Sequence, residues 1–239
     1  MFQALSRRRL PRPGRCPVCR SATLFVDTAD HPRNGLYCLR CLSLPRQRAI
    51  MAALDRRFPR WPSLSIHESS PSGPASSAIA RRATRYTCSY LLDGVPEGAV
   101  RDGKTCQNLE HLTYSDTSFD LLITQDVMEH VMSPAAAFAE IARVLKGAGA
   151  HVFTVPYWPD RTTKVRARPG DDGIDYLEEP QYHDNPVDAH GSLVATDWGR
   201  ELRQAIFEAS GLHTEIDDLD DPALGLRGTF KEVFITTKT

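Results

Sequence analysis

Residues 106–156 constrain the fold of this chain most, because a strand, a polar loop, a helix and a second strand follow one another there. Residues 121–123 form an apolar run without alternation, which is typical of a parallel strand covered on both faces. A helix is predicted from the N-cap Ser133 to a glycine at position 147, and the second strand over residues 151–155. Such a βαβ unit places the polar residues 124–130 at the carboxyl edge of a parallel sheet, where open α/β sheets bind ligands.

Four short stretches in this region carry a family likeness: NLEHLTY at 108–114, SFD at 118–120, EHV at 129–131 and RVLKGAG at 143–149. In this order and spacing they resemble the class I S-adenosylmethionine-dependent methyltransferases of the type 11 kind. The resemblance covers roughly residues 62–239 and implies a Rossmann-like, doubly wound, seven-stranded α/β sheet. It also implies S-adenosylmethionine as cofactor and S-adenosylhomocysteine as product. An unrelated doubly wound domain is the alternative.

The cofactor-binding turn departs from the family pattern, which has an acidic strand end followed by several glycines. Glu68 ends the predicted first strand and is placed to hold the cofactor's amino group, but only Gly73 keeps the glycine character of the turn. No carboxylate ends the second strand, so Ser89 or Tyr90 would have to hold the ribose hydroxyls. The resemblance implies cofactor contacts from Glu68, Ser69, Ser70, Gly73, Ser89, Tyr90, Asn108, Leu109, Gln125 and Asp126. A domain that has lost cofactor binding is the alternative.

A metal-binding pattern precedes the sheet domain. Its ligands are Cys16, Cys19, Cys38 and Cys41. The two Cys-x-x-Cys pairs enclose eighteen residues, a spacing typical of zinc ribbons, and four thiolates leave no open coordination position, so the predicted zinc is structural. Two disulfides are the alternative, and they are disfavoured because residues 1–15 are basic and lack a secretory apolar region. Cys88 and Cys106 are expected to be buried small apolar groups.

The chain divides into a four-cysteine zinc module over residues 1–44, a linking helix over 45–61 and the sheet domain over 62–239. Residues 1–60 contain thirteen Arg and three Asp, a net charge of +10, which leaves −11 for the rest. Such a basic module could contact RNA or an anionic substrate, or it could dock on the acidic domain. Docking is favoured, because the arginines are not interleaved with aromatic residues.

The sequence contains no apolar run near the length of about eighteen residues that a membrane span needs. A soluble, cytoplasmic protein is therefore expected.

The segment after the strand at 121–123 carries the first catalytic candidates. If this turn is helical, Asp126, Glu129 and His130 share one face. They resemble the acidic-x-x-Glu-His element of ubiquinone-biosynthesis O-methyltransferases, which implies a divalent cation such as Mg²⁺ near the acceptor hydroxyl. The alternative, which is favoured, is that this element orders the loop without metal and that His130 acts as a base.

A second candidate lies in residues 157–196, which are interpreted as an irregular insertion that covers the acceptor. It contains the stretch YHDNP at 182–186, and His183 is the predicted base, with His130 and Glu129 in support. A helix over 197–210 and a strand over 231–237 complete the sheet domain.

These features predict a methyltransferase that acts on a hydroxyl of a small molecule, such as a sugar or a secondary metabolite. The cofactor supplies the leaving group, so the protein needs alignment, water exclusion and proton removal. The alternatives are an RNA methyltransferase that uses the basic zinc module, and a non-catalytic cofactor-binding domain. The acceptor and the oligomeric state are left open by the sequence.

Overall fold

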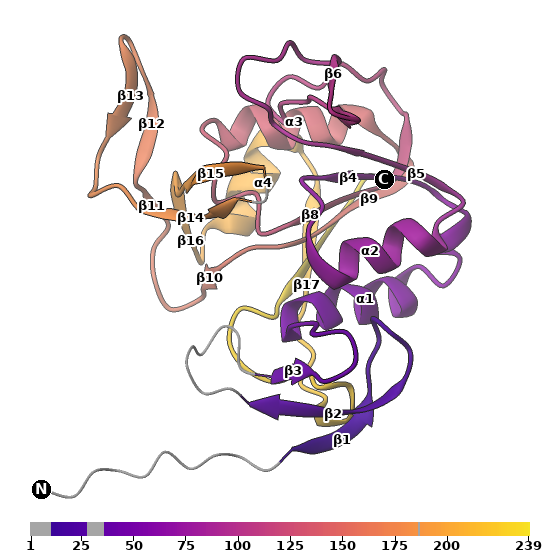
Figure 1. Cartoon of the computed structure of the whole chain (residues 1–239). Coiled ribbons are helices and arrows are strands. Elements are labelled where there is room, and N and C mark those ends of the chain that lie inside the picture. The colour runs from indigo at the N-terminus through magenta and orange to yellow at the C-terminus, as the bar shows by residue number, and fades with distance from the viewer. Residues whose placement is uncertain (1–10, 28–35, 186) are drawn as a thin grey trace, which may run out of the picture.

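The computed structural model describes residues 11–27, 36–185 and 187–239. Its centre is a six-stranded sheet with the order β17-β18-β9-β8-β4-β5 (Figure 1). The strands are β4 (Ser65–Ser69), β5 (Arg85–Ser89), β8 (Phe119–Gln125), β9 (Leu145–Thr154), β17 (His213–Asp217) and β18 (Val233–Thr237). Strands β5, β4, β8 and β9 are parallel, whereas β18 is antiparallel to both β9 and β17. The parallel half contains the βαβ unit that the sequence predicts.

Helices cover both faces of the sheet. Helices α1 (Pro45–Arg57) and α2 (Gly73–Arg82) lie on one face, and α3 (Pro134–Val144) and α4 (Leu202–Ser210) on the other. Side chains alternate along β8, so Leu121 and Ile123 join the first core, while Leu122 joins the second. This two-sided burial explains why the strand is an unbroken apolar run.

The central sheet differs from the sequence predictions in three places. Within the described residues it has six strands rather than seven, and an isolated parallel bridge between Tyr90 and Cys106 stands where a further strand would extend it beyond β5. Helix α3 ends at Val144, because Leu145 is extended and pairs with Phe119 as the first residue of β9. The predicted helix over 197–210 begins only at α4, because its first residues form β16 (Thr196–Gly199).

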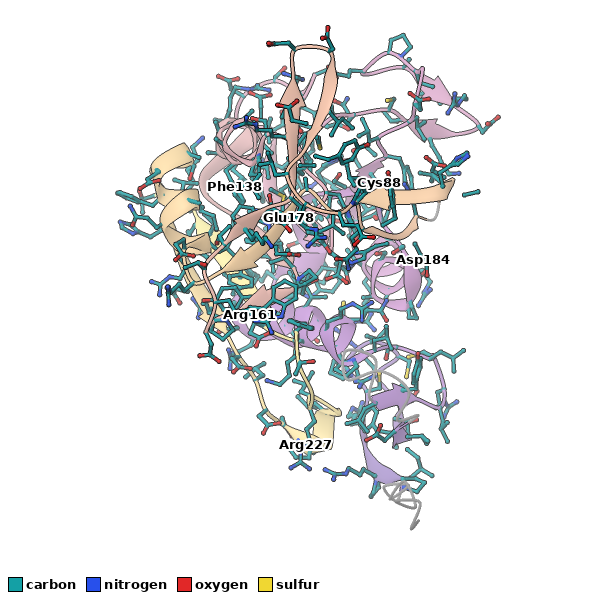
Figure 2. The ribbon with its side chains drawn as sticks, turned by 90° about the vertical axis from the view of Figure 1, so that its left-hand side faces the viewer. Cys88, Phe138, Arg161, Glu178, Asp184 and Arg227 are labelled. Carbon is teal, nitrogen blue, oxygen red and sulfur yellow. The ribbon has the colours of Figure 1, made fainter. Side chains whose placement is uncertain are left out.

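The four-cysteine module is a three-stranded antiparallel sheet, made of β1 (Arg12–Arg15), β2 (Ala22–Asp27) and β3 (Leu36–Cys38). Its apolar side chains share one continuous core with α1, α2 and the face of the central sheet beneath them. A C-terminal segment around η3 (Pro222–Leu224) packs against β1, and Figure 2 shows its neighbour Arg227 at the level of the module. Gly225 has φ +68°, and an added Cβ would lie 2.7 Å from the Phe25 ring, so glycine permits this close packing.

The sequence suggested that the insertion between β9 and α4 is irregular, but the structure shows short strands there. The insertion contains two antiparallel hairpins, β12–β13 and β14–β15, which lie beside the central sheet in Figure 1. Its elements are β10 (Tyr157–Trp158), β11 (Lys164–Val165), β12 (Ala167–Gly170), β13 (Gly173–Tyr176), β14 (Tyr182–Asn185) and β15 (Asp188–Leu193). The strands are short and mostly exposed, so they give little of the apolar periodicity on which strand prediction depends.

Short elements complete the fold: η2 (Trp61–Ser63), β6 (Val100–Arg101) and β7 (Lys104–Thr105). Among the described residues, no helix has both the length and the apolar character needed to cross a membrane.

Candidate functional site

The carboxyl edge of β4 is built around Glu68, which is completely buried. Its carboxylate accepts hydrogen bonds from Ser76 Oγ at 2.6 Å, Gln125 Nε2 at 2.7 Å and Tyr86 Oη at 2.8 Å. Burial raises the pKa of Glu68, and these donors oppose that shift. The predicted cofactor contact is therefore enclosed by protein groups that tie the ends of β4 and β8 to α2, which suits a carboxylate that shapes the turn.

The turn after β4 is tight and lies against the first turn of α1. Ser70 adopts φ +52° and donates its N–H to the carbonyl of Ser89, and Gly73 adopts φ +76°. An added Cβ at Gly73 would lie 2.5 Å from Gln47 Nε2, so the Gln47 side chain would have to shift, and the positive φ itself disfavours a side chain at this position. Ser69 is buried and Ser70 partly exposed. One retained glycine is thus sufficient to build the turn because α1 closes over it.

The residues at the end of β5 differ in access. Ser89 is completely buried, and its Oγ lies 3.0 Å from Nε2 of His67. Burial lowers the pKa of His67 to about 4, so this imidazole is neutral near pH 7. Tyr90 is partly exposed, and its Oη donates to the carbonyl of Pro71 at 3.4 Å. Of the two predicted ribose contacts, Tyr90 is therefore the one with solvent access.

The Asn108 turn, which the resemblance places near the adenine, is held by local hydrogen bonds. The side-chain oxygen of Asn108 accepts the N–H of Glu110 at 3.0 Å, and Leu109 is buried. Glu110 in turn accepts the N–H groups of Met132 and Ser133 at the start of α3. Sequence reasoning missed this role of Glu110, although a carboxylate is the side chain that a helix N-terminus favours.

The last residue of β8 and the residue that follows it have different partners. Gln125 donates to Glu68, as described above, whereas the Asp126 carboxylate pairs with Arg46 of α1. Residues 126–130 form a turn rather than a helix, with φ +53° at Asp126. The prediction that Asp126, Glu129 and His130 share one face is therefore wrong, because Asp126 turns toward α1.

Glu129 and His130 are instead joined by His183 of β14. The three offer ligand atoms that lie within 4.8 Å of one another. Oε1 of Glu129 is 3.8 Å from Nε2 of His130 and 3.7 Å from Nδ1 of His183, and the two rings stack edge to face at 5.1 Å. The Glu129 side chain is 1% exposed, and those of His130 and His183 are 17% and 27% exposed. The structure thus brings together the three predicted catalytic residues, from segments over fifty positions apart.

The backbone of the insertion fixes this cluster, whose three members are Glu129, His130 and His183. The carbonyl of Leu193 lies 2.9 Å from Nδ1 of His130, and the N–H groups of Ala195 and Thr196 donate to the carbonyl of Glu129. If Nδ1 of His130 carries the proton, Nε2 faces the carboxylate as an acceptor. Two imidazoles beside a carboxylate can remove a proton. As metal ligands they suit a transition metal better than Mg²⁺, which prefers oxygen ligands.

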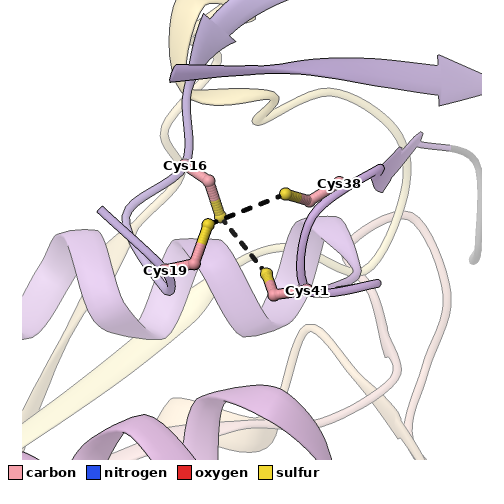
Figure 3. Close-up of side chains that lie close together, drawn as sticks. All are labelled: Cys16, Cys19, Cys38 and Cys41. Atoms are coloured by element: carbon pink, nitrogen blue, oxygen red, sulfur yellow. Dashed lines mark hydrogen bonds between the residues drawn. The ribbon is translucent and has the colours of Figure 1, made fainter. Parts of the chain in front are cut away.

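The four cysteines converge as the spacing predicts (Figure 3). The sulfur of Cys16 lies 3.7 Å from that of Cys41, and the sulfur of Cys19 lies 3.9 Å from that of Cys38. Zinc–sulfur bonds of about 2.3 Å would set the corners of a tetrahedron roughly 3.8 Å apart, so the donor set fits zinc. All six cysteines are free thiols, which does not support the disulfide alternative. Cys106 is buried as expected, whereas Cys88 is partly exposed.

A buried arginine on α1 lies beside this thiol cluster. Arg48 donates to the carbonyls of Ser43, Leu36 and Gly225, and its guanidinium lies 4.7 Å from the Phe25 ring centroid. Burial lowers the pKa of Arg48 to about 10, while the neighbouring thiols act in the opposite direction. A cation here would offset the negative charge of four thiolates if they bind a metal. No sequence pattern pointed to Arg48, since its neighbours come from distant segments.

The docking interpretation of the basic end agrees with the ion pairs of α1. Arg57 pairs with Glu215, Arg56 with Asp217, and Arg46 with Asp126, all from the acidic sheet domain. Some of the residues named in the sequence predictions lie outside the described residues. They are Arg7, Arg8, Arg9 and Arg33 of the basic region, residues 1–10 of the predicted non-secretory N-terminus, and Pro186 of the YHDNP stretch.

Comparison with known proteins identifies the central domain. The model of a family described as a methyltransferase domain matches residues 72–153, from the start of α2 to the last residues of β9. Residues 72–153 are therefore similar to a methyltransferase domain. A stretch of 56 residues is 38% identical to an uncharacterized protein of Methanocaldococcus jannaschii. That match covers 23% of this chain and 24% of the relative, so the chain matches about a quarter of the relative's length.

Solved structures share the fold of this domain at low sequence identity. DesVI of Streptomyces venezuelae is 13% identical with a TM-score of 0.52, and the match covers 81% of this chain and 92% of that one. The 1,6-didemethyltoxoflavin-N1-methyltransferase of Burkholderia thailandensis, solved with S-adenosylhomocysteine, is 12% identical with a TM-score of 0.50. That match covers 81% of this chain and 78% of the other. The predicted fold class is thereby confirmed.

Proposed function

We propose that this protein transfers the methyl group of S-adenosylmethionine to a hydroxyl of a small molecule. The observation that carries the proposal is the cluster of Glu129, His130 and His183 at the carboxyl edge of a methyltransferase sheet. S-adenosylmethionine supplies a methyl group on a sulfonium, which is already a good leaving group. What remains for this chain is to bind the cofactor, orient the acceptor, exclude water and take up a proton.

The cofactor is proposed to lie across the carboxyl ends of β4, β5 and β8. The turn at Ser70 and Gly73 borders this edge, Tyr90 is the accessible group at the end of β5, and Asp126 follows β8. Glu68, Ser89 and Leu109 are buried, so they support the shape of the edge from below. The remaining proposed cofactor-side residues are Ser69, Asn108 and Gln125. Each either contacts the cofactor or positions its neighbours through hydrogen bonds within the protein.

His183 is proposed as the base. It is the most exposed member of the cluster and lies on hairpin β14–β15, whose neighbouring residue Asp184 is labelled in Figure 2. With S-adenosylmethionine bound, transfer of its methyl group to the acceptor oxygen would leave S-adenosylhomocysteine, and His183 would take up the hydroxyl proton. Glu129 stabilises the imidazolium that forms, because a carboxylate 3.7 Å away favours its charge. Nε2 of His130 lies 3.8 Å from the same carboxylate oxygen, and the bond between Nδ1 and the Leu193 carbonyl fixes the ring beside it.

A small-molecule acceptor is preferred over RNA because arginines of α1 form ion pairs within the protein. Their partners are Glu215, Asp217 and Asp126. The free thiols suit a reducing compartment, so we place the protein in the cytoplasm.

The test is cofactor binding followed by an acceptor search. Saturation with S-adenosylhomocysteine at a hundred times its dissociation constant should raise the free energy of unfolding by about 2.7 kcal/mol. An intact-mass screen of metabolite extracts with isotope-labelled cofactor should then find an acceptor that gains one methyl group. The absence of any thermal shift at millimolar ligand would support the non-catalytic alternative. Steeply salt-dependent binding and methylation of RNA would instead support the RNA alternative.

A further inference from the structure

We propose that Arg46 and Asp126 form a recognition pair for the zwitterionic amino-acid end of the cofactor, and that the four-cysteine module holds Arg46 in this place. The inference rests on the proposed cofactor binding, and goes beyond it by assigning α1, which precedes the sheet domain, to the cofactor site. It also gives the zinc module a role in binding.

The pair lies at the edge where the cofactor is proposed to bind. Asp126 comes directly after β8, which pairs with β4, and the cofactor turn follows β4. The N–H of Asp126 donates to the carbonyl of Thr154, and the Asp126 carboxylate accepts from the Thr154 hydroxyl, so the Asp126 side chain is fixed from the sheet side. Nε of Arg46 lies 2.5 Å from Oδ2 of Asp126. Both side chains are 19% exposed, so the pair is ordered and still reachable from solvent.

The chemistry of the pair is complementary to an α-amino acid. A guanidinium has five N–H donors in a planar fork and can bind a carboxylate on each of two edges. Arg46 can therefore keep Asp126 and receive the cofactor carboxylate, while Asp126 accepts from the cofactor ammonium. Glu68, the carboxylate that the family pattern offers for the ammonium, is fully buried and accepts three hydrogen bonds within the protein. The Asp126 side chain, in contrast, is 19% exposed.

The metal module determines where α1 begins. The Oγ of Ser43 lies 3.4 Å from the sulfur of Cys16 and 3.2 Å from that of Cys41, and α1 starts two residues later. Arg48 on the first turns of α1 is bonded to Leu36 and Ser43 of the module. Gln47 accepts the N–H of Leu44 at 3.0 Å and closes over Gly73. Arg46 is thus held between a metal cluster and the cofactor turn.

Two probes separate recognition of the amino-acid end from general damage to the site. S-adenosylhomocysteine carries the zwitterion, whereas 5′-methylthioadenosine keeps the adenosine and the sulfur but lacks it. We would titrate the zinc-loaded, full-length protein with each by calorimetry. Arg46→Gln should weaken S-adenosylhomocysteine binding by roughly ten- to a hundredfold, as expected for a charged hydrogen bond, and change methylthioadenosine binding by less than about twofold.

Asp126→Asn should also weaken S-adenosylhomocysteine binding more than methylthioadenosine binding. This second variant keeps the test valid if Arg46→Gln folds poorly. Arg57→Gln is the matched control, because Arg57 lies in the last turn of α1 and pairs with Glu215 and Asp217. It should leave both affinities unchanged. Equal losses for both probes in the Arg46 and Asp126 variants, or unchanged S-adenosylhomocysteine binding, would overturn the inference. Failure of the unaltered protein to bind either probe would overturn the proposed function itself.

Discussion

The four-cysteine module and the hairpin insertion border the same sheet edge, but they are built in opposite ways. The module buries Val18, Phe25 and Leu36 in the core beneath the central sheet, and Arg48 of α1 ties it to distant carbonyls. In the insertion, all of β13 is exposed, and hairpin β12–β13 projects from the body with Glu178 near its base in Figure 2. A well-packed side and a lightly packed side would suit the proposed enzyme, which has one fixed ligand, the cofactor, and one variable ligand, the acceptor.

The largest effect is expected from loss of the metal, because the module is part of the main core. Cys38→Ser should reduce zinc from about one per chain and destabilise α1 and the cofactor edge as well as the module. A structural zinc site contributes apparent binding free energies of about 10–16 kcal/mol, comparable with the whole stability of a domain. The measurements are elemental analysis, circular dichroism and calorimetry with S-adenosylhomocysteine.

A module with a core of its own would instead unfold on loss of zinc and leave the sheet intact. Cys88→Ser is the control, since Cys88 lies outside the thiol cluster. A metal-free protein with unchanged unfolding and unchanged cofactor affinity would show that the two regions are independent after all.

The second effect concerns the acceptor side. His183→Ala should lower turnover by about a hundred- to ten-thousandfold, the usual contribution of a general base, with cofactor affinity nearly unchanged. His190→Ala is the matched control on the same hairpin, because His190 is 95% exposed and pairs only locally with Asp188. Steady-state kinetics with the identified acceptor, as a function of pH, provides the measurement.

Wild-type turnover in His183→Ala would refute the base assignment. So would a loss of turnover on chelation that Mg²⁺ restores while the zinc content stays constant. That result would favour a catalytic cation at Glu129 and His130.

A smaller effect is expected from pH, through a buried histidine on the cofactor side. Burial lowers the folded pKa of His67 to about 4, below its ordinary value of 6.5. Because the unfolded chain then binds the proton more readily, this contribution to stability is full above pH 6.5 and is lost as the pH falls toward 4. Between pH 7 and pH 5 the loss from His67 should be about 2 kcal/mol.

Urea unfolding at the two pH values would measure the loss, and His67→Gln should reduce the difference by this amount. His151, whose pKa burial lowers to about 3, should keep a similar dependence in that variant. An equal pH dependence in the two proteins would mean that His67 is not neutral in the fold.

The smallest effect on stability is expected at the tip of the insertion. Replacing residues 168–175 by Asn-Gly, which favours a tight hairpin turn, should change the free energy of unfolding by about 0.5 kcal/mol or less. The affinity for S-adenosylhomocysteine should not change, whereas the selectivity for the acceptor can change. Thermal unfolding and calorimetry check the first two points. A large loss of stability or of cofactor binding would show that the two regions are less different than their packing indicates.

The sequence by itself determined the class of fold, the βαβ unit and the convergence of the four cysteines. Each depends on local order: the apolar run at β8, the Ser133 start of α3 and the spacing of the cysteine pairs are all readable along the chain. The sequence also singled out Glu129, His130 and His183, but not their contact, because the third residue reaches the others through a hairpin with weak periodicity.

Only the tertiary structure decided which carboxylate at the sheet edge is accessible and which is enclosed. The sequence favours Glu68 for the cofactor's amino group, yet Glu68 is buried under three donors, whereas Asp126 is partly exposed and paired with Arg46. The same holds for the link between the metal module and the cofactor turn. Burial and pairing depend on side chains brought together from distant segments, and no local pattern records which segments will meet.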